Sequence, residues 1–201
     1  MNDIDQQLFE DALGHLGMLL EQGKHPPVTL VVCGGSALLA RNLVSRTTTK
    51  DVDVVALAGT SGELLDPEPL PEYLREAAET TRYDLGLPGN WLNNEPSRGN
   101  GGLYRAGLPE GIIARSEKRC YGKILTAYLI GRLDQIYFKL PAAADQGGGR
   151  HLADLLELNP KAEELLGAAR WARMYDPSPG FAWLLRELLK KMGYEPIADQ
   201  I

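Results

Sequence analysis

Apolar positions along the chain recur with either a helical or a strand period. Five leucines between positions 8 and 20 follow the helical period and predict an amphipathic helix over residues 3–22, which Gly23 ends. A continuous apolar run at residues 28–33 predicts a buried central strand. Residues 51–57 alternate at first and predict a second strand, and residues 123–130 predict a third.

Helical periods fill much of the remaining sequence. Helices are expected over residues 37–43, 70–85 and 133–144, and then over 152–158, 160–173 and 181–192. A Gly-, Asn- and Pro-rich stretch, residues 86–107, is expected to be a long ordered loop. The pattern predicts an α/β (α+β) fold. It has a small mixed sheet flanked by helices in residues 1–130, followed by a helical C-terminal region, residues 131–201, packed on that core.

Composition and charge narrow the function classes. The 201 residues carry a net charge of −6, which argues against a wholly basic nucleic-acid clamp, although six cations between residues 98 and 123 form a local basic stretch. The two cysteines lack CxxC spacing, so neither a disulfide framework nor a cysteine zinc site is expected. No apolar run approaches the roughly 20 residues that span a bilayer, and the N-terminus lacks signal-peptide character. We therefore expect a cytoplasmic protein without a membrane partner.

The strongest chemical signal lies between the first two strands. Gly34, Gly35 and Ser36 follow the strand at residues 28–33 and precede the short helix. A helix N-terminus offers free N–H groups and the positive end of the helix dipole to an anion. Glycines let a phosphate approach the backbone closely, and Ser36 adds a hydroxyl donor. These three residues therefore predict a triphosphate cradle.

Paired carboxylates open the next strand. Asp51 and Asp53 are two residues apart, so their side chains point to the same side of a strand, about 7 Å from one another. Two such carboxylates can share a divalent metal ion, and their mutual repulsion is costly without a cation. Each motif alone is common in proteins. Their occurrence together, in this order and on consecutive strands, favours a joint metal and phosphate site.

This order resembles that of the nucleotidyltransferase superfamily, which shares the fold of the catalytic core of DNA polymerase beta. The pattern is most similar to bacterial AbiEii-type toxins, in which Gly-Gly-x-Ala-Leu is followed by Arg, Thr and Asp-x-Asp. Here the matching residues are Gly34–Leu38, Arg46, Thr48 or Thr49, and Asp51-Val52-Asp53. The resemblance implies a nucleotidyltransferase-type sheet and Mg²⁺ held by Asp51 and Asp53. It also implies that an NTP is bound through Gly34, Gly35, Ser36 and Arg46.

A weaker resemblance continues downstream. Trp91-Leu92-Asn93 is similar to an element that some relatives carry before the third strand. Residues 132–140 and 150–158 resemble two family helices and point to Lys139 and Asp154. Lys139 would contact a phosphate or the base, and Asp154 would hold Lys139 or act as a base. Polymerase-type members carry a third carboxylate on a later strand, which residues 123–130 lack.

The resemblance implies metal-dependent transfer of a nucleotidyl group from an NTP to an acceptor hydroxyl. The acceptor is open: a tRNA end, as in the toxin relatives, a protein or a small molecule, including a sugar phosphate or an aminoglycoside. A cognate antitoxin protein is the partner that a toxin–antitoxin or defence system would supply. The alternative is a catalytically weak binding or regulatory module. The missing strand carboxylate favours that alternative, and the retained pair, Asp51 and Asp53, opposes it.

Overall fold

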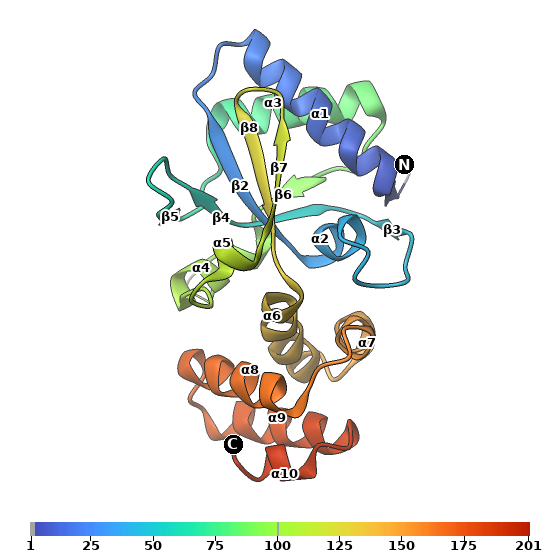
Figure 1. The fold of residues 1–201 in the computed structure, drawn as a ribbon, viewed down its shortest axis with the longest axis vertical. Helices are drawn as coiled ribbons and strands as arrows, with labels where there is room; N and C mark the ends of the chain where they lie inside the picture. The colour runs from blue at the N-terminus through green and yellow to red at the C-terminus, as the bar shows by residue number, and fades with distance from the viewer. Residues whose placement is uncertain (1–2, 100) are drawn as a thin grey trace. The chain divides into compact units, whose positions relative to one another are not determined.

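The apolar run at residues 28–33 forms the central strand of a mixed sheet. In the computed structural model, which describes residues 3–99 and 101–201, this strand is β2 (Val28–Cys33). The strand order is β5-β4-β2-β8-β7, and β6 pairs with the other side of β4 (Figure 1). Five of the six residues of β2 are buried, because the strand is covered on both faces, as its continuous apolar sequence predicts.

The strands beside β2 end or begin along one border of the sheet. This border, which runs across the strand ends, is here called the edge of the sheet. On one side β4 runs antiparallel to β2, and on the other side β8 runs parallel to it, followed by the antiparallel β7. The first residues of β4 and β7 therefore lie at the same edge as the last residues of β2 and β8. The bounds are β4 Val52–Ala58, β5 Leu64–Leu65, β6 Leu92–Asn93, β7 Glu117–Tyr121 and β8 Leu125–Leu129.

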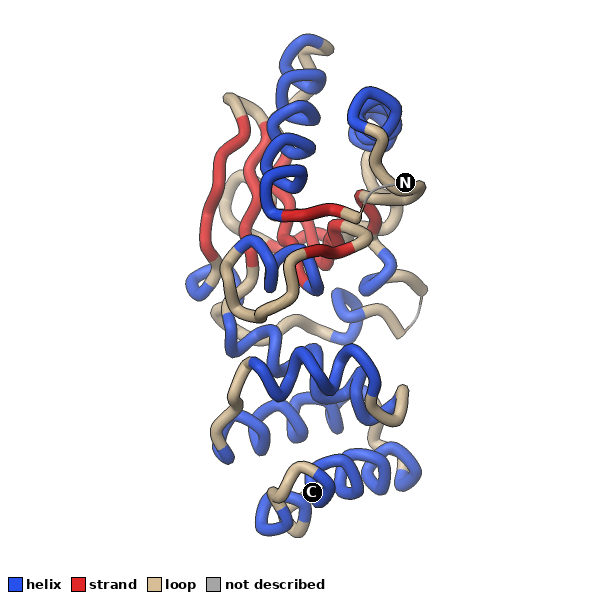
Figure 2. Tube along the Cα trace, turned by 90° about the vertical axis from the view of Figure 1, so that its right-hand side faces the viewer, coloured by secondary structure: helices blue, strands red, loops and turns tan. Residues whose placement is uncertain are grey.

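Two helices cover one face of this sheet. They are α1 (Gln6–Gln22) and α3 (Glu72–Leu85). Their buried side chains form one core cluster with alternate residues of β2, β4 and β8, so both helices lie on the same face (Figure 2). The α/β prediction of a mixed sheet flanked by helices is confirmed. The other helices of this part are α2 Gly34–Ala40, η1 Glu95–Ser97 (a 3₁₀ helix), α4 Leu103–Ala106 and α5 Ile112–Arg115.

Short and charged elements were missed at the sequence level. The strand β7 reads Glu-Lys-Arg-Cys-Tyr, which lacks the apolar alternation that marks a half-buried strand. The expected loop over residues 86–107 contains β6, η1 and α4. A two-stranded ribbon of β1 (Ile4–Asp5) and β3 (Thr48–Thr49) also went unpredicted. The helix expected to begin at residue 3 begins at Gln6, because the Asp5 carboxylate caps it by accepting from the Leu8 N–H at 2.8 Å.

Contacts divide the chain into two units, Met1–Ile130 and Gly131–Ile201. The described residues of the second unit form only helices, as predicted for this region. Aromatic contacts join α6 to α8, where Trp171 packs against both Tyr137 and Phe138. The helices are α6 Arg132–Asp145, α7 Gly149–Glu157, α8 Ala162–Tyr175, α9 Pro179–Lys191 and α10 Glu195–Ala198.

Among the described residues, no helix combines the length and the hydropathy that crossing a membrane requires. The longest described helix, α1, has 17 residues, and polar side chains recur along it. This helix instead buries one apolar stripe against α3 and the sheet.

Arg132 joins three helices of the second unit. Its Nε donates to the carbonyl oxygen of Leu158 at 2.7 Å, and its two terminal nitrogens contact the Glu164 carboxylate at 2.7 and 2.9 Å. The hydrogen bond from Arg132 is the largest cause that lowers the pKa of Glu164, and the same bond raises the pKa of Arg132. This bidentate pair fixes the starts of α6 and α8 together with the end of α7.

We predict that Glu164→Gln lowers the free energy of unfolding by about 1 kcal/mol at neutral pH, since the pair is partly exposed. Because folding lowers the pKa of the Glu164 carboxyl, the ionised pair stabilises the folded state fully at pH values above the ordinary glutamate pKa of about 4.3. This stabilisation is lost as the pH falls through the lowered pKa. Urea unfolding at several pH values should show the wild-type advantage shrink in acid. Glu163→Gln, at an exposed neighbour on α8, is the matched control and should change little. Equal effects of the two substitutions would contradict the assignment.

Candidate functional site

The carboxylate of Asp53 lies where three strands meet at one edge of the sheet. Strand register places Asp53 opposite Cys33, the last residue of β2, and opposite Asn93, the last residue of β6. The backbone N–H of Val52 donates to the carbonyl oxygen of Trp91, which fixes β6 beside β4. The glycine turn leaves β2 at this same edge, so the two motifs that were separated along the sequence are adjacent in space.

Gly34 contacts the Asp53 carboxylate directly. Its φ of +67° lies in the left-handed region that favours glycine, and a Cβ added there would collide with Oδ2 of Asp53. Both the conformation and the lack of a side chain are therefore required where β2 passes into α2. The predicted approach of the glycine turn to the second aspartate is present in the structure.

The two residues that follow Gly34 are buried. The helix begins at Gly34 rather than at residue 37 and has seven residues, and within it Gly35 and Ser36 are both buried. The Ser36 hydroxyl donates to the carbonyl oxygen of Cys33 at 3.3 Å and has no exposed surface. In this structure the hydroxyl expected to bind a phosphate is instead used inside the fold.

Asp51 lines an open hollow beside this edge. The hollow has a volume of about 470 Å³, and Lys50, Asn93 and Glu95 also line it. Asp51 and Asp53 are half-buried whereas Val52 between them is buried, which is the alternation that the sequence predicts. The polar neighbours of Asp51 were not foreseen, because Asn93 and Glu95 lie in the segment expected to be a loop.

Asp51 and Asp53 suit a Mg²⁺ ion that is bound partly by protein and partly by substrate phosphates and water. The described part of the chain holds no group of three or more His, Cys, Asp or Glu side chains arranged around a common metal position. Mg²⁺ in enzymes is commonly held by only one or two protein carboxylates, together with substrate phosphates and water. Asp51 and Asp53 supply two half-buried carboxylates: Asp51 lines the hollow, whereas Asp53 packs its carboxylate against Gly34.

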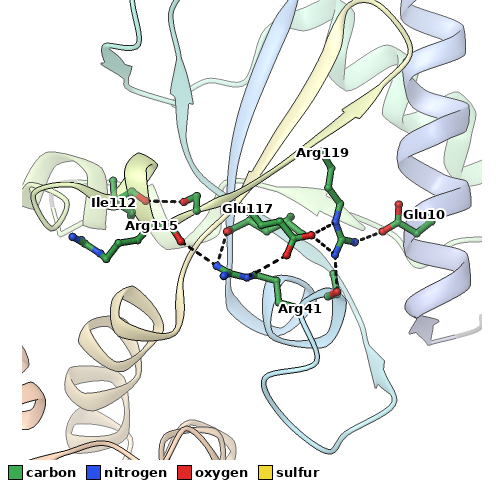
Figure 3. Close-up of polar contacts among 9 residues, drawn as sticks. Glu10, Arg41, Ile112, Arg115, Glu117 and Arg119 are labelled. Carbon is green, nitrogen blue, oxygen red and sulfur yellow. Dashed lines mark hydrogen bonds and ion pairs between the residues drawn. The ribbon is translucent and has the colours of Figure 1, made fainter.

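A third carboxylate does not join them from the far side of the sheet. Glu117 begins β7 at the same edge, but β2 and β8 lie between β7 and β4. Three strand spacings correspond to about 14 Å. Glu117 is also engaged by Arg119 at 2.8 Å and by Arg41 at 3.6 Å (Figure 3). Asp134, which follows β8 in the sequence, is fully buried in α6 of the second unit.

The arginines around Glu117 hold the far end of α2. Arg119 donates to the carbonyl oxygen of Ala40, the last residue of α2, at 2.8 Å and pairs with Glu10 of α1 (Figure 3). Arg41 donates to the carbonyl oxygens of Leu129 and Arg115 at 3.1 and 3.4 Å. Burial opposes the charge of Arg119, but its hydrogen bond to Glu117 and the nearby charge of Glu10 keep its pKa above the usual value. The helix that starts at the glycine turn is thus anchored at its end.

The basic stretch between residues 98 and 123 is largely compensated. Arg98 pairs with Glu95 at 2.6 Å. Arg105 pairs with Asp66 at 3.1 Å, and Arg119 pairs with two glutamates. Half of the six cations therefore have carboxylate partners, which weakens the expectation of a continuous basic groove for RNA.

The remaining predicted residues lie elsewhere. Arg46 lines a separate hollow with residues at the start of α1, including Asp5 and Gln6, rather than the hollow of Asp51. Lys139 and Asp154 belong to the second unit, where the Lys139 ammonium lies 2.8 Å from the Asp154 carboxylate. Their side chains are only 7% and 5% exposed. The expected contact between these two residues is present, and their part in a reaction stays a prediction.

No protein-family model, curated protein or solved structure matches this chain. A nucleotidyltransferase relationship therefore depends on the sequence motifs and on the geometry of the sheet edge. The direct approach of Gly34 to Asp53 is the strongest part of that geometry.

We predict that Gly34→Ala destabilises the protein more than Gly86→Ala. Both glycines have a nearly identical left-handed φ, which costs alanine about 1–2 kcal/mol. An added Cβ at Gly86 meets no atom within 4 Å, whereas at Gly34 it collides with Asp53. Thermal or urea unfolding of the two variants measures the difference. Equal losses would mean that the Asp53 carboxylate moves away without cost.

Proposed function

We propose that the protein is a metal-dependent nucleotidyltransferase that acts on an NTP. The observation that carries the proposal is the contact of the Gly34 turn with the Asp53 carboxylate at the sheet edge, with Asp51 two residues away. A phosphate chain needs close backbone approach and a compensating cation, and this edge offers a glycine beside two carboxylates. The order of these elements along the chain supports the same conclusion.

The reaction is an in-line displacement at the α-phosphorus of the NTP. The acceptor hydroxyl oxygen forms the new O–P bond, the bond from the α-phosphorus to the bridging oxygen breaks, and pyrophosphate leaves. The hydroxyl proton is released to water. Mg²⁺, when bound, neutralises charge on the phosphate oxygens. Asp51 and Asp53 would hold this ion, and the absence of a side chain at Gly34 lets the Asp53 carboxylate lie against the glycine turn. Positioning and electrostatic stabilisation supply most of the rate enhancement.

The acceptor and partners follow from the family resemblance. The toxin-like pattern implies a tRNA end as one acceptor, a protein or a small molecule remains the alternative, and a cognate antitoxin is the implied protein partner. The family resemblance also implies a phosphate contact for Lys139 with Asp154 as its holder, and within the second unit these two side chains pair with one another at 2.8 Å. We propose a cytoplasmic location for this reaction, because NTPs are supplied there.

One observation favours a second function, a binding or regulatory module with little turnover. The described residues form no group of three carboxylates around a common metal position: Glu95, which shares the hollow with Asp51, pairs with Arg98, and Glu117 is engaged by two arginines. Incubation with each labelled NTP and total cellular RNA, proteins and small molecules separates the two functions. Label in an acceptor supports the transferase, whereas metal-dependent nucleotide binding without transfer supports the module.

We predict that Asp51→Asn and Asp53→Asn each weaken Mg²⁺-dependent NTP binding at least tenfold. The loss of one carboxylate removes a metal ligand but also relieves repulsion between like charges, so thermal stability should hold or rise. Calorimetric titration with each NTP, with and without Mg²⁺, measures the affinity. Unchanged Mg·NTP affinity in both variants would show that the pair does not form the metal site.

We predict that Lys139→Met destabilises the protein by about 3 kcal/mol, because it leaves the buried Asp154 carboxylate without its ammonium partner. The double variant Lys139→Met/Asp154→Leu replaces the pair by apolar groups and should regain most of this loss. Because the double variant should be stable, it tests the role of Lys139 in nucleotide binding separately from its role in stability. It should bind Mg·NTP more weakly than the wild type if Lys139 contacts a phosphate. Wild-type affinity would remove Lys139 from the nucleotide site.

A further inference from the structure

A second cavity adjoins the hollow of Asp51. It lies between α3 and the segment over residues 90–98, has a volume of about 340 Å³, and is here called the α3 pocket. The α3 pocket and the hollow of Asp51 share Asn90, Asn93 and Glu95, so both spaces border the same short segment. A volume in this range suits a molecule of the size of a sugar phosphate or a nucleotide.

The carboxylates that line the α3 pocket already have cationic partners. Glu79 accepts two hydrogen bonds from Arg82, at 2.8 and 2.7 Å. Glu95 pairs with Arg98 at 2.6 Å, and Glu68 lies 3.4 Å from a terminal nitrogen of Arg105. Each negative charge of the lining is therefore compensated by an arginine.

Arg75 is the remaining charged group of the lining. Its Nε donates to the carbonyl oxygen of Leu70 at 3.2 Å, which anchors the guanidinium at the pocket. Glu79, four residues further along α3, would be its natural helical partner, but that carboxylate is taken by Arg82. Among the described residues no carboxylate lies within 4 Å of the Arg75 side-chain nitrogens. Arg75 is exposed and also borders a hollow lined by Glu72, Glu76 and Glu79, and its two terminal nitrogens remain for an anion.

The rest of the lining of the α3 pocket combines polar amide groups with apolar side chains. Asn94 donates its amide N–H to the carbonyl oxygen of Pro67 at 3.0 Å, which leaves its amide oxygen to accept a hydrogen bond from a hydroxyl. Buried apolar side chains form the remainder: Leu70, Ala78, Trp91 and Leu92. A ligand with one anionic group and several hydroxyls matches this combination of a guanidinium, amides and an apolar wall.

We propose that the α3 pocket binds a small phosphate monoester rich in hydroxyl groups, with Arg75 as its phosphate ligand. Its use as the nucleotidyl acceptor rests on the proposed function, because the shared segment brings its hydroxyls next to the hollow of Asp51. A small molecule is favoured over RNA because a phosphate backbone needs several cations in a row. The pocket supplies one uncompensated guanidinium, and three arginines of the nearby basic stretch are paired with carboxylates.

Calorimetric titration of the full chain tests this site, without Mg²⁺ or NTP. The probes are ribose 5-phosphate, ribose, inorganic phosphate and a 5′-phosphorylated RNA oligonucleotide. We expect ribose 5-phosphate to bind more tightly than inorganic phosphate, and ribose not to bind detectably. Arg75→Gln should weaken ribose 5-phosphate binding at least tenfold. Arg186→Gln, at an exposed arginine of α9, is the control and should leave it unchanged.

Several results would overturn the proposal. These are no binding of ribose 5-phosphate by the wild type, equal binding by Arg75→Gln, and binding of the RNA oligonucleotide alone. Loss of Mg·NTP binding in Arg75→Gln with ribose 5-phosphate binding intact would assign Arg75 to the nucleotide instead. Asp53→Asn separates the two proposals, since it should lose Mg·NTP binding and still bind ribose 5-phosphate. Ribose 5-phosphate binding by a wild type that binds no NTP would refute the transferase and leave the α3 pocket as a binding site.

Discussion

The contact between Gly34 and the Asp53 carboxylate depends on one feature of the sheet, the antiparallel pairing of β2 and β4. This pairing brings the end of one strand beside the start of the other, so a turn and a carboxylate separated by eighteen residues become neighbours. Any side chain at Gly34 would occupy the space beside Oδ2 of Asp53. The candidate site is therefore fixed by strand register and by the absence of a single Cβ.

The rest of the first unit supports this edge. Apolar residues of β2, β4 and β8 pack against α1 and α3, which fixes the strands that carry the motifs. Arg119 and Arg41 bind carbonyl oxygens at the end of α2 and at the neighbouring strand end, so the C-terminal end of α2 is held in place. Glu117 serves this anchoring network, which is why its charge is committed to arginines and not to the aspartates.

The sequence predicted elements with strong apolar periods well and weakly patterned elements poorly. The strand Val28–Cys33 was predicted to the residue, because a continuous apolar run bounded by proline and glycine has few alternatives. The charged edge strand β7 and the two-residue β6 carry no such pattern, and tertiary pairing alone defines them. For the same reason the motif spacing predicted Gly34 beside Asp53, whereas Asn93 and Glu95 near Asp51 depend on β6. Burial of the Ser36 hydroxyl depends on how α2 packs, which local sequence does not determine.

Charge placement connects the two cavities of the first unit. Asp51 brings a carboxylate to the hollow beside Asn93, which Glu95 and Lys50 also line, and Asp53 adds a second carboxylate two residues away in the sequence. In the α3 pocket every carboxylate has an arginine partner and Arg75 is left over, a property that attracts an anion. A phosphate-bearing molecule is therefore drawn to the α3 pocket without a metal ion, whereas a polyphosphate needs a cation to approach the aspartates. The segment over residues 90–98 thus lines two cavities of different charge, which supports the proposal that an NTP and a second phosphorylated molecule bind beside one another.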